Sequence, residues 1–198
     1  PKLVYGPASP YSKTGAGAGD PAAVAALTRD DLVTFQQAWL RPDKAKIFVV
    51  SDLPLTEVKQ LLEAEFGDWQ GSGAAGAKDF TAGAVQVTPR IVLVDRPDWP
   101  QALIYAGQLT PLKGSDDLLS QEVANDVLGG DFLSRINYDL RETKHWSYGA
   151  GGGFGHNEHA VVYAISAPVQ ADKTGESIAS LKTDLKDFLG DKGITAAE

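Results

Sequence analysis

Two histidines close together are the first candidates for chemistry, because imidazole nitrogens are common zinc ligands. His156 and His159 enclose Asn157-Glu158. Zinc peptidases use H-E-x-x-H or H-x-x-E-H, in which histidines four residues apart on a helix face one metal ion. Here the spacing is three and the flanking residues are typical of strands, where residues three apart point to opposite faces. The sequence therefore favours an exposed hairpin turn and predicts no metal ligand in this chain.

Five glycines among residues 149–155 form a second candidate site. A phosphate-binding loop would follow a strand, precede a helix and end in Lys-Ser or Lys-Thr, whereas a strand is expected after this run. Glycine in a strand otherwise indicates a bulge or a close approach by another backbone. The run is therefore compatible with an extended peptide lying against the strand.

Arg141 and Tyr148 form a third candidate, at the end of a predicted short helix and the start of a predicted strand. A guanidinium and a phenol delivered to one point can donate hydrogen bonds to a peptide carbonyl or to the oxyanion that develops there. Arg141 also lies between Asp139 and Glu142, so a surface ion pair would explain it equally. Both interpretations stay open on the residues alone.

Composition excludes several other kinds of site. With no cysteine, the chain has no disulfide, thiolate metal site or cysteine nucleophile. A net charge of −8 argues against binding to nucleic acid, which requires basic patches. No apolar run is long enough for a membrane span. Because the chain begins with Pro1 and contains no methionine, we expect a processed or excised piece.

The pattern of elements predicts an α+β fold, an antiparallel sheet with helices packed on one face. Strands that follow one another without an intervening helix favour antiparallel over parallel pairing. Helices are expected at 29–40, capped by Thr28 with Asp31, at 56–66, at 115–128, in a short helix from Asp131 or Ser134 that turns Leu133, Ile136 and Leu140 inward, and at 174–189. Strands are expected at 46–50, 90–95, 102–106, 146–154 and 160–167.

The domain organisation is expected to change in the middle of the chain. Residues 71–87 hold four glycines and five alanines, which is typical of a linker. Residues 1–70 then form a loop-like lead-in followed by a helix-strand-helix unit, and residues 88–198 form the larger part.

The stretch Leu128–Ala150 (LGGDFLSRINYDLRETKHWSYGA) is similar to the signature of the pitrilysin/insulysin family of zinc metallopeptidases (M16, the inverzincins). The shared pattern is Leu-Gly-Gly, Ser-Arg, Leu-Arg-Glu and an aromatic-x-Tyr. Leu27–Asp52 resembles the helix-strand unit that ends the family's first domain. By this resemblance, residues 28–69 end one repeat and residues 88–198 are most of a second repeat, truncated within a helix at Thr195–Glu198.

The resemblance implies a division of labour between two halves of a closed chamber. In the family, an H-x-x-E-H helix and a downstream Glu hold zinc in the first domain, upstream of this chain, while an Arg and a Tyr seven residues later hold the substrate backbone; Arg141 and Tyr148 match that pair. The implied partners are a peptide or protein substrate and a zinc-bearing half, in the same chain or in another subunit. The chain alone is expected to be inactive, and a noncatalytic scaffold or peptide-binding subunit is the alternative.

Two further expectations follow from the resemblance. The strand at 46–50, with its flanking helices, is expected to dock on the open sheet edge of the second repeat, within the chain or by swapping. Bacterial members suggest a periplasmic location, although a cytoplasmic one stays open.

Overall fold

The computed structural model describes residues 1–13, 19–83 and 88–198. The chain divides into two compact units. The larger unit combines Pro1–Thr14 with Phe80–Glu198, and the smaller unit comprises Gly15–Asp79. Residues 14–18 of the expected lead-in and residues 84–87 of the expected linker lie outside the described residues. The assignment of the chain to two repeats stays a prediction.

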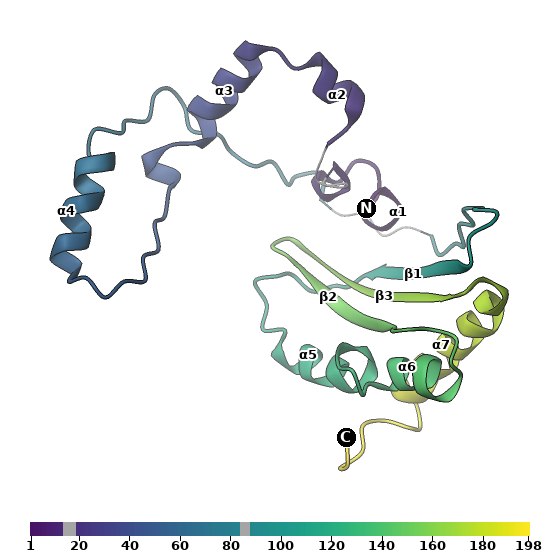
Figure 1. Ribbon diagram of the computed structural model, residues 1–198. Coiled ribbons are helices and arrows are strands. Elements are labelled where there is room, and N and C mark those ends of the chain that lie inside the picture. The colour runs from purple at the N-terminus through teal and green to yellow at the C-terminus, as the bar shows by residue number, and fades with distance from the viewer. Residues whose placement is uncertain (14–18, 84–87) are drawn as a thin grey trace. The chain divides into compact units, whose positions relative to one another are not determined.

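An antiparallel sheet of three strands organises the larger unit (Figure 1). Its strands are β1 (Gln101–Leu109), β2 (Gly151–Asn157) and β3 (Ala160–Gln170), in the order β1-β3-β2. A tight turn joins β2 to β3. Strand β1 pairs with β3 along the whole length of β1, from Gln101 opposite Gln170 to Leu109 opposite Val162. The sheet thus places the strand that comes last in sequence at its centre.

Helical segments cover one face of this sheet (Figure 1). They are α5 (Leu119–Asn125), the π-helical η3 (Asp126–Gly130), α6 (Arg135–Asn137), the π-helical η4 (Tyr138–Thr143), the 3-10 turn η5 (Ala171–Lys173) and α7 (Thr174–Leu189). The core between the two layers contains Leu128, Ile136, Leu140, Ile165, Ala167, Val169 and Leu181. Alternate residues of β3 supply its sheet side, as the period of two requires. The α+β prediction is confirmed.

The opposite face of the sheet is covered at one end by the start of the chain. Helix α1 (Lys2–Tyr5) and the 3-10 turn η1 (Pro10–Lys13) bring Val4, Tyr5 and Tyr11 against Leu109, Ala160 and Val162. The Asn157 amide donates to the Tyr5 hydroxyl at 2.7 Å, and the His159 backbone N–H donates to the Tyr11 hydroxyl at 3.1 Å. The expected loop-like lead-in is therefore partly helical and packed on the sheet.

The smaller unit consists of helices α2 (Pro21–Ala26), α3 (Arg29–Trp39) and α4 (Leu55–Phe66), with a 3-10 turn, η2 (Pro42–Lys44). The capping box of Thr28 and Asp31 is present at the start of α3, as predicted. Helix α4 begins at Leu55, one residue before the expected start, with Pro54 in the N-cap position.

Two of the predicted strands are absent. Residues 46–50 and 90–95 adopt neither helix nor strand, and the apolar side chains of Phe48, Val50, Ile91 and Leu93 are almost fully exposed. A β-branched run favours strand only where a neighbouring strand can pair with it, because β-propensity depends mostly on context. Residues 46–50 belong to the smaller unit, and their expected docking on the sheet edge of the second repeat, within the chain or by swapping, stays a prediction.

Two elements begin several residues later than expected. Strand β2 begins at Gly151, not at Trp146, because the preceding residues form a turn tied to the end of β3. Helix α5 begins at Leu119, since Asp116 and Asp117 accept hydrogen bonds from the nearby Lys113 and Leu119 amides in a turn. The helix expected from residue 115 therefore begins four residues later.

Candidate functional site

Arg141 projects from η4, one of two π-helical segments that follow one another beneath the sheet. Single π-helical turns inside helices frequently accompany functional sites. The guanidinium carbon of Arg141 lies 4.4 Å from the ring centroid of Phe132 and 5.3 Å from that of Tyr148. Both separations are within the range of a cation–π interaction. The cationic group predicted from the sequence is thus in contact with two aromatic rings.

Tyr148 is 84% exposed although its backbone is tightly held. The amides of Trp146 and Ser147 both donate to the carbonyl of Leu140, in the middle of η4, at 2.9 and 3.2 Å. Ser147 also pairs with Val169 as an isolated β-bridge. These bonds fix the chain on either side of the phenol and leave the phenol itself in solvent. The structure therefore brings Arg141 and Tyr148 together on one exposed surface.

His145 closes the turn between these two residues. Its φ of 57° lies in the left-handed region that is unusual for a residue other than glycine. The imidazole Nδ1 lies 3.0 Å from the Arg141 carbonyl oxygen, and because a carbonyl can only accept, Nδ1 carries the hydrogen. The Gln170 amide donates to the His145 carbonyl at 3.0 Å. The seven-residue step from Arg141 to Tyr148 is thus a compact, anchored loop.

Asn137 joins the two backbone segments that carry the aromatic rings. Its buried Nδ2 donates to the Phe132 carbonyl at 2.6 Å, and its Oδ1 accepts from the Ala150 amide at 2.9 Å. Because the carboxamide serves both segments, the positions of Phe132 and of the chain next to Tyr148 depend on one side chain. Sequence reasoning missed Asn137 and Phe132, although a bulky apolar residue directly after Gly129-Gly130-Asp131 was a visible signal.

The ion pair that the sequence left open is also present. Arg141 Nε lies 3.2 Å from Glu142 Oε1. Asp139, the other candidate partner, instead pairs with Lys144 and accepts a hydrogen bond from Ser180. One ion pair through Nε does not occupy the other N–H groups of a five-donor guanidinium. Within the described residues, Glu142 and the two aromatic rings therefore fix the position of the Arg141 guanidinium, and its remaining N–H groups can donate to a further acceptor.

The two histidines of the first candidate lie on a hairpin, as predicted. His156 is in β2 and pairs with Glu122 of α5 at 2.8 Å. His159 lies in the turn, and its ring centroid is 4.3 Å from that of Phe80, with the two ring planes tilted by 51°. Within residues 1–13, 19–83 and 88–198, no three His, Cys, Asp or Glu side chains gather in a group that could hold a metal ion. The residues that the structure describes therefore do not fit a zinc site.

The glycines of the second candidate have a structural explanation. A Cβ on Gly151 would lie 2.6 Å from the Gly129 carbonyl oxygen, and one on Gly129 would lie 2.7 Å from the Gly152 nitrogen. The Asn125 amide donates to the Gly152 carbonyl at 2.8 Å. The close backbone approach that the glycines indicated is thus made by η3 of the same chain. At these positions glycine is required by the contact with η3 and not by a bound peptide.

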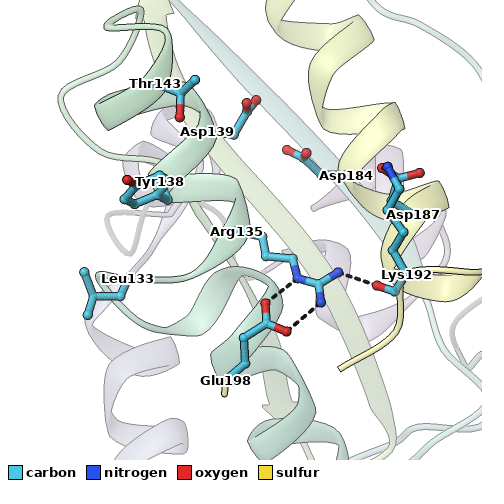
Figure 2. A pocket seen from close by; sticks show the side chains of 9 residues that line it. All are labelled: Leu133, Arg135, Tyr138, Asp139, Thr143, Asp184, Asp187, Lys192 and Glu198. Carbon is cyan, nitrogen blue, oxygen red and sulfur yellow. Dashed lines mark hydrogen bonds and ion pairs between the residues drawn. The ribbon is translucent and has the colours of Figure 1, made fainter. Parts of the chain in front are cut away.

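A polar pocket of about 360 Å³ opens beside η4, between α6, α7 and the end of the chain. Figure 2 shows the Arg135 guanidinium between the Glu198 carboxylate and the Lys192 backbone; both Glu198 oxygens are 2.7 Å away. Arg135 holds the pKa of Glu198 down, at about 2. Burial, and then the nearby Asp139 carboxylate, raise the pKa of Asp184 to about 6. Ion pairs with Arg135 of α6 and Asp187 of α7 therefore hold residues 192–198 against these two helices.

In the parts of the chain that are described, no helix is both long and apolar enough to cross a membrane.

Comparison with known proteins finds similar sequences among zinc proteases. Zinc proteases of Mycobacterium bovis and Mycobacterium tuberculosis, both termed uncharacterised, are each 26% identical over 186 residues, which cover 91% of this chain and 41% of each relative. The chain thus spans about two fifths of the length of these curated relatives. The fold is similar to the peptidase M16 inactive domain from Pseudomonas fluorescens, with a TM-score of 0.81, 20% identity, and coverage of 98% of this chain and 45% of that one. A protease from Helicobacter pylori matches with a TM-score of 0.74, 18% identity, and coverage of 90% and 44%.

The family model of the peptidase M16 inactive domain matches residues 26–198. This match covers most of the chain and includes Arg141, Tyr148 and every strand of the sheet. The chain therefore belongs to the family of the peptidase M16 inactive domain.

Proposed function

We propose that this chain is the substrate-binding, non-zinc part of a zinc-dependent metalloendopeptidase of the pitrilysin/insulysin type. The observation that carries the proposal is the contact between Arg141 and the exposed Tyr148, in a chain of the peptidase M16 inactive domain family. The Arg141 guanidinium carbon lies 5.3 Å from the centroid of the Tyr148 ring. The proposal assigns zinc chemistry to the other half of the peptidase, in the same chain or in a partner subunit. Among the described residues of this chain, no group of His, Asp and Glu side chains could hold the metal ion. The zinc supplied there would polarise the substrate carbonyl.

The role of this chain is to hold an extended peptide and to stabilise charge. A free N–H of Arg141 and the O–H of Tyr148 donate to one substrate carbonyl oxygen. When water attacks the carbonyl carbon, that oxygen gains negative charge and both hydrogen bonds strengthen, which lowers the barrier. The cation–π contacts with Phe132 and Tyr148 and the fixed turn at His145 limit the motion of the donors, so little reorganisation accompanies the reaction.

A noncatalytic peptide-binding or scaffold subunit of the same fold is the second candidate. It is favoured by the chemistry of the described site, which offers donors and rings but no general base positioned beside a nucleophile. The two candidates make different demands on the rest of the protein. An H-x-x-E-H motif upstream, or in a partner that co-purifies, supports the peptidase, and its absence from both supports the scaffold.

Steady-state peptide hydrolysis by the protein joined to its zinc-bearing half tests the proposal. Tyr148→Phe removes one donor and should lower kcat by about a hundredfold with little change in KM, because the lost bond is strongest in the transition state. Arg141→Ala should lower kcat/KM at least as much. Arg29→Ala is the matched control, since Arg29 is an exposed surface arginine beside Asp30. Unchanged kcat/KM in both site variants would remove the assigned roles.

A further inference from the structure

Phe132 is a large apolar side chain presented to solvent at the proposed site. It lies between η3 and α6, is 58% exposed, and its ring centroid is 4.4 Å from the Arg141 guanidinium. Leu133, the next residue, is also exposed, as is Tyr148, whose ring centroid is 5.3 Å from the same guanidinium. Single exposed apolar residues are ordinary, but several grouped around a functional cation mark a contact surface.

The loop that carries Phe132 is held in place. The Asn137 amide binds the Phe132 carbonyl at 2.6 Å, and the Leu133 amide donates to Asp131 Oδ1 at 2.9 Å. The Ser134 amide donates to the Asp131 carbonyl at 3.1 Å, which closes a turn. Because these bonds fix the backbone on both sides of the ring, the exposure of Phe132 is a property of an ordered loop.

We propose that Phe132 is a specificity-determining residue, which contacts the substrate side chain nearest the carbonyl held by Arg141 and Tyr148 and favours an apolar side chain there. This inference rests on the proposed function. An extended peptide rises about 3.3 Å per residue. The ring is 4.4 Å from the guanidinium, so it lies within about one residue of the bound carbonyl. The guanidinium occupies part of the ring, and the rest is open to an apolar group.

The chemistry of the neighbouring groups agrees with an apolar preference. Arg141 and Glu142 are paired at 3.2 Å, so their opposite charges largely compensate and strongly favour neither a cationic nor an acidic substrate side chain at this point. An aliphatic or aromatic side chain meets neither charge and covers the exposed ring. The substrate class is therefore peptides with a large apolar residue beside the scissile carbonyl.

Competition between two peptides in the enzyme joined to its zinc-bearing half tests the inference. The peptides differ only in Leu or Ala beside the cleaved bond, and the ratio of their kcat/KM values is measured for the unaltered protein, Phe132→Ala and Phe132→Leu. We expect Phe132→Ala to reduce the preference for Leu about tenfold, and Phe132→Leu to keep most of it. Leu119→Ala is the matched control, because Leu119 is 63% exposed on α5.

The outcomes separate this inference from the proposed function. An equal loss of kcat/KM for both peptides in Phe132→Ala would mean that the ring only supports Arg141, and would overturn the specificity role, as would an unchanged ratio. Arg141→Ala addresses the proposed function itself, since it should slow both peptides alike and leave their ratio unchanged. Full rates in Arg141→Ala, with an altered ratio in Phe132→Ala, would overturn the oxyanion role alone.

Discussion

The side-chain oxygen of Asn137 accepts the backbone N–H of Ala150 at 2.9 Å, in the interior behind the candidate site. Since the same carboxamide also binds the Phe132 carbonyl, Asn137→Ala leaves two main-chain groups without a partner. We expect the free energy of unfolding to fall by about 2 kcal/mol, the usual cost of buried unsatisfied groups. Urea denaturation measures it, with the exposed Lys182→Ala as the control. A loss no larger than in that control would contradict the bridging role.

Gly151 and Gly153 are a matched pair in one strand. A Cβ on Gly151 meets the Gly129 carbonyl at 2.6 Å, whereas a Cβ on Gly153 has nothing within 4 Å. Gly151→Ala should destabilise the protein by about 1–3 kcal/mol, the usual cost of overpacking. Gly153→Ala should leave stability unchanged or raise it slightly, because alanine loses less conformational freedom. Thermal unfolding of both variants tests this prediction, and equal melting temperatures would contradict the packing explanation.

Asp184 makes stability depend on pH. Its folded pKa of about 6 exceeds the ordinary 3.8, so the folded state binds the proton more tightly and stability falls as pH rises from about 4 to 6. The full shift would correspond to about 3 kcal/mol, but solvent screens a half-exposed carboxylate, so we expect Asp184→Asn to gain about 1 kcal/mol at pH 7. Urea denaturation at pH 4 and pH 7 tests this. The gain should vanish at pH 4, and a constant gain would contradict titration of Asp184.

Glu198 makes stability depend on pH in the opposite direction. Its pKa is lowered from 4.5 to about 2 by Arg135, so the contact is fully stabilising above about pH 4.5 and is lost as pH falls through 2. Amide exchange at residues 192–198 should therefore lose protection in acid earlier than exchange in α7. Glu198→Gln should show the reduced protection already at pH 6. If protection in this segment is the same in both proteins at pH 6, the ion pair does not fasten it.

Local signals were sufficient for some elements. The capping box at Thr28 and Asp31 predicted the start of α3, and the spacing of Ile178, Leu181 and Leu185 predicted α7. These signals depend on residues three or four apart, so the sequence contains the whole interaction. By contrast, 46–50 and 90–95 read as strands from their β-branched residues, but strand formation depends on a partner far away in the chain.

Some residues of the candidate site were likewise predicted from the sequence, and others were not. The resemblance to the M16 signature singled out Arg141 and Tyr148, and the structure places their side chains in contact. Phe132 and Asn137 were missed because their roles arise from a loop folding back on η4 and β2. The burial of Ile136 and Leu140 was predicted by helical spacing, whereas Leu133 was wrongly placed inside, since the helix begins after it.

The bond from Asn157 to Tyr5 joins residues 152 positions apart, and it closes a loop that contains all of Gly15–Asp79. The smaller unit is therefore an insertion within the larger one. During synthesis, the first thirteen residues have no docking surface until the β2–β3 hairpin has left the ribosome, so the larger unit completes its fold late. A protease that nicks the chain between α4 and Phe80 would leave an N-terminal piece, containing α1 to α4, held noncovalently to the sheet through residues 1–13.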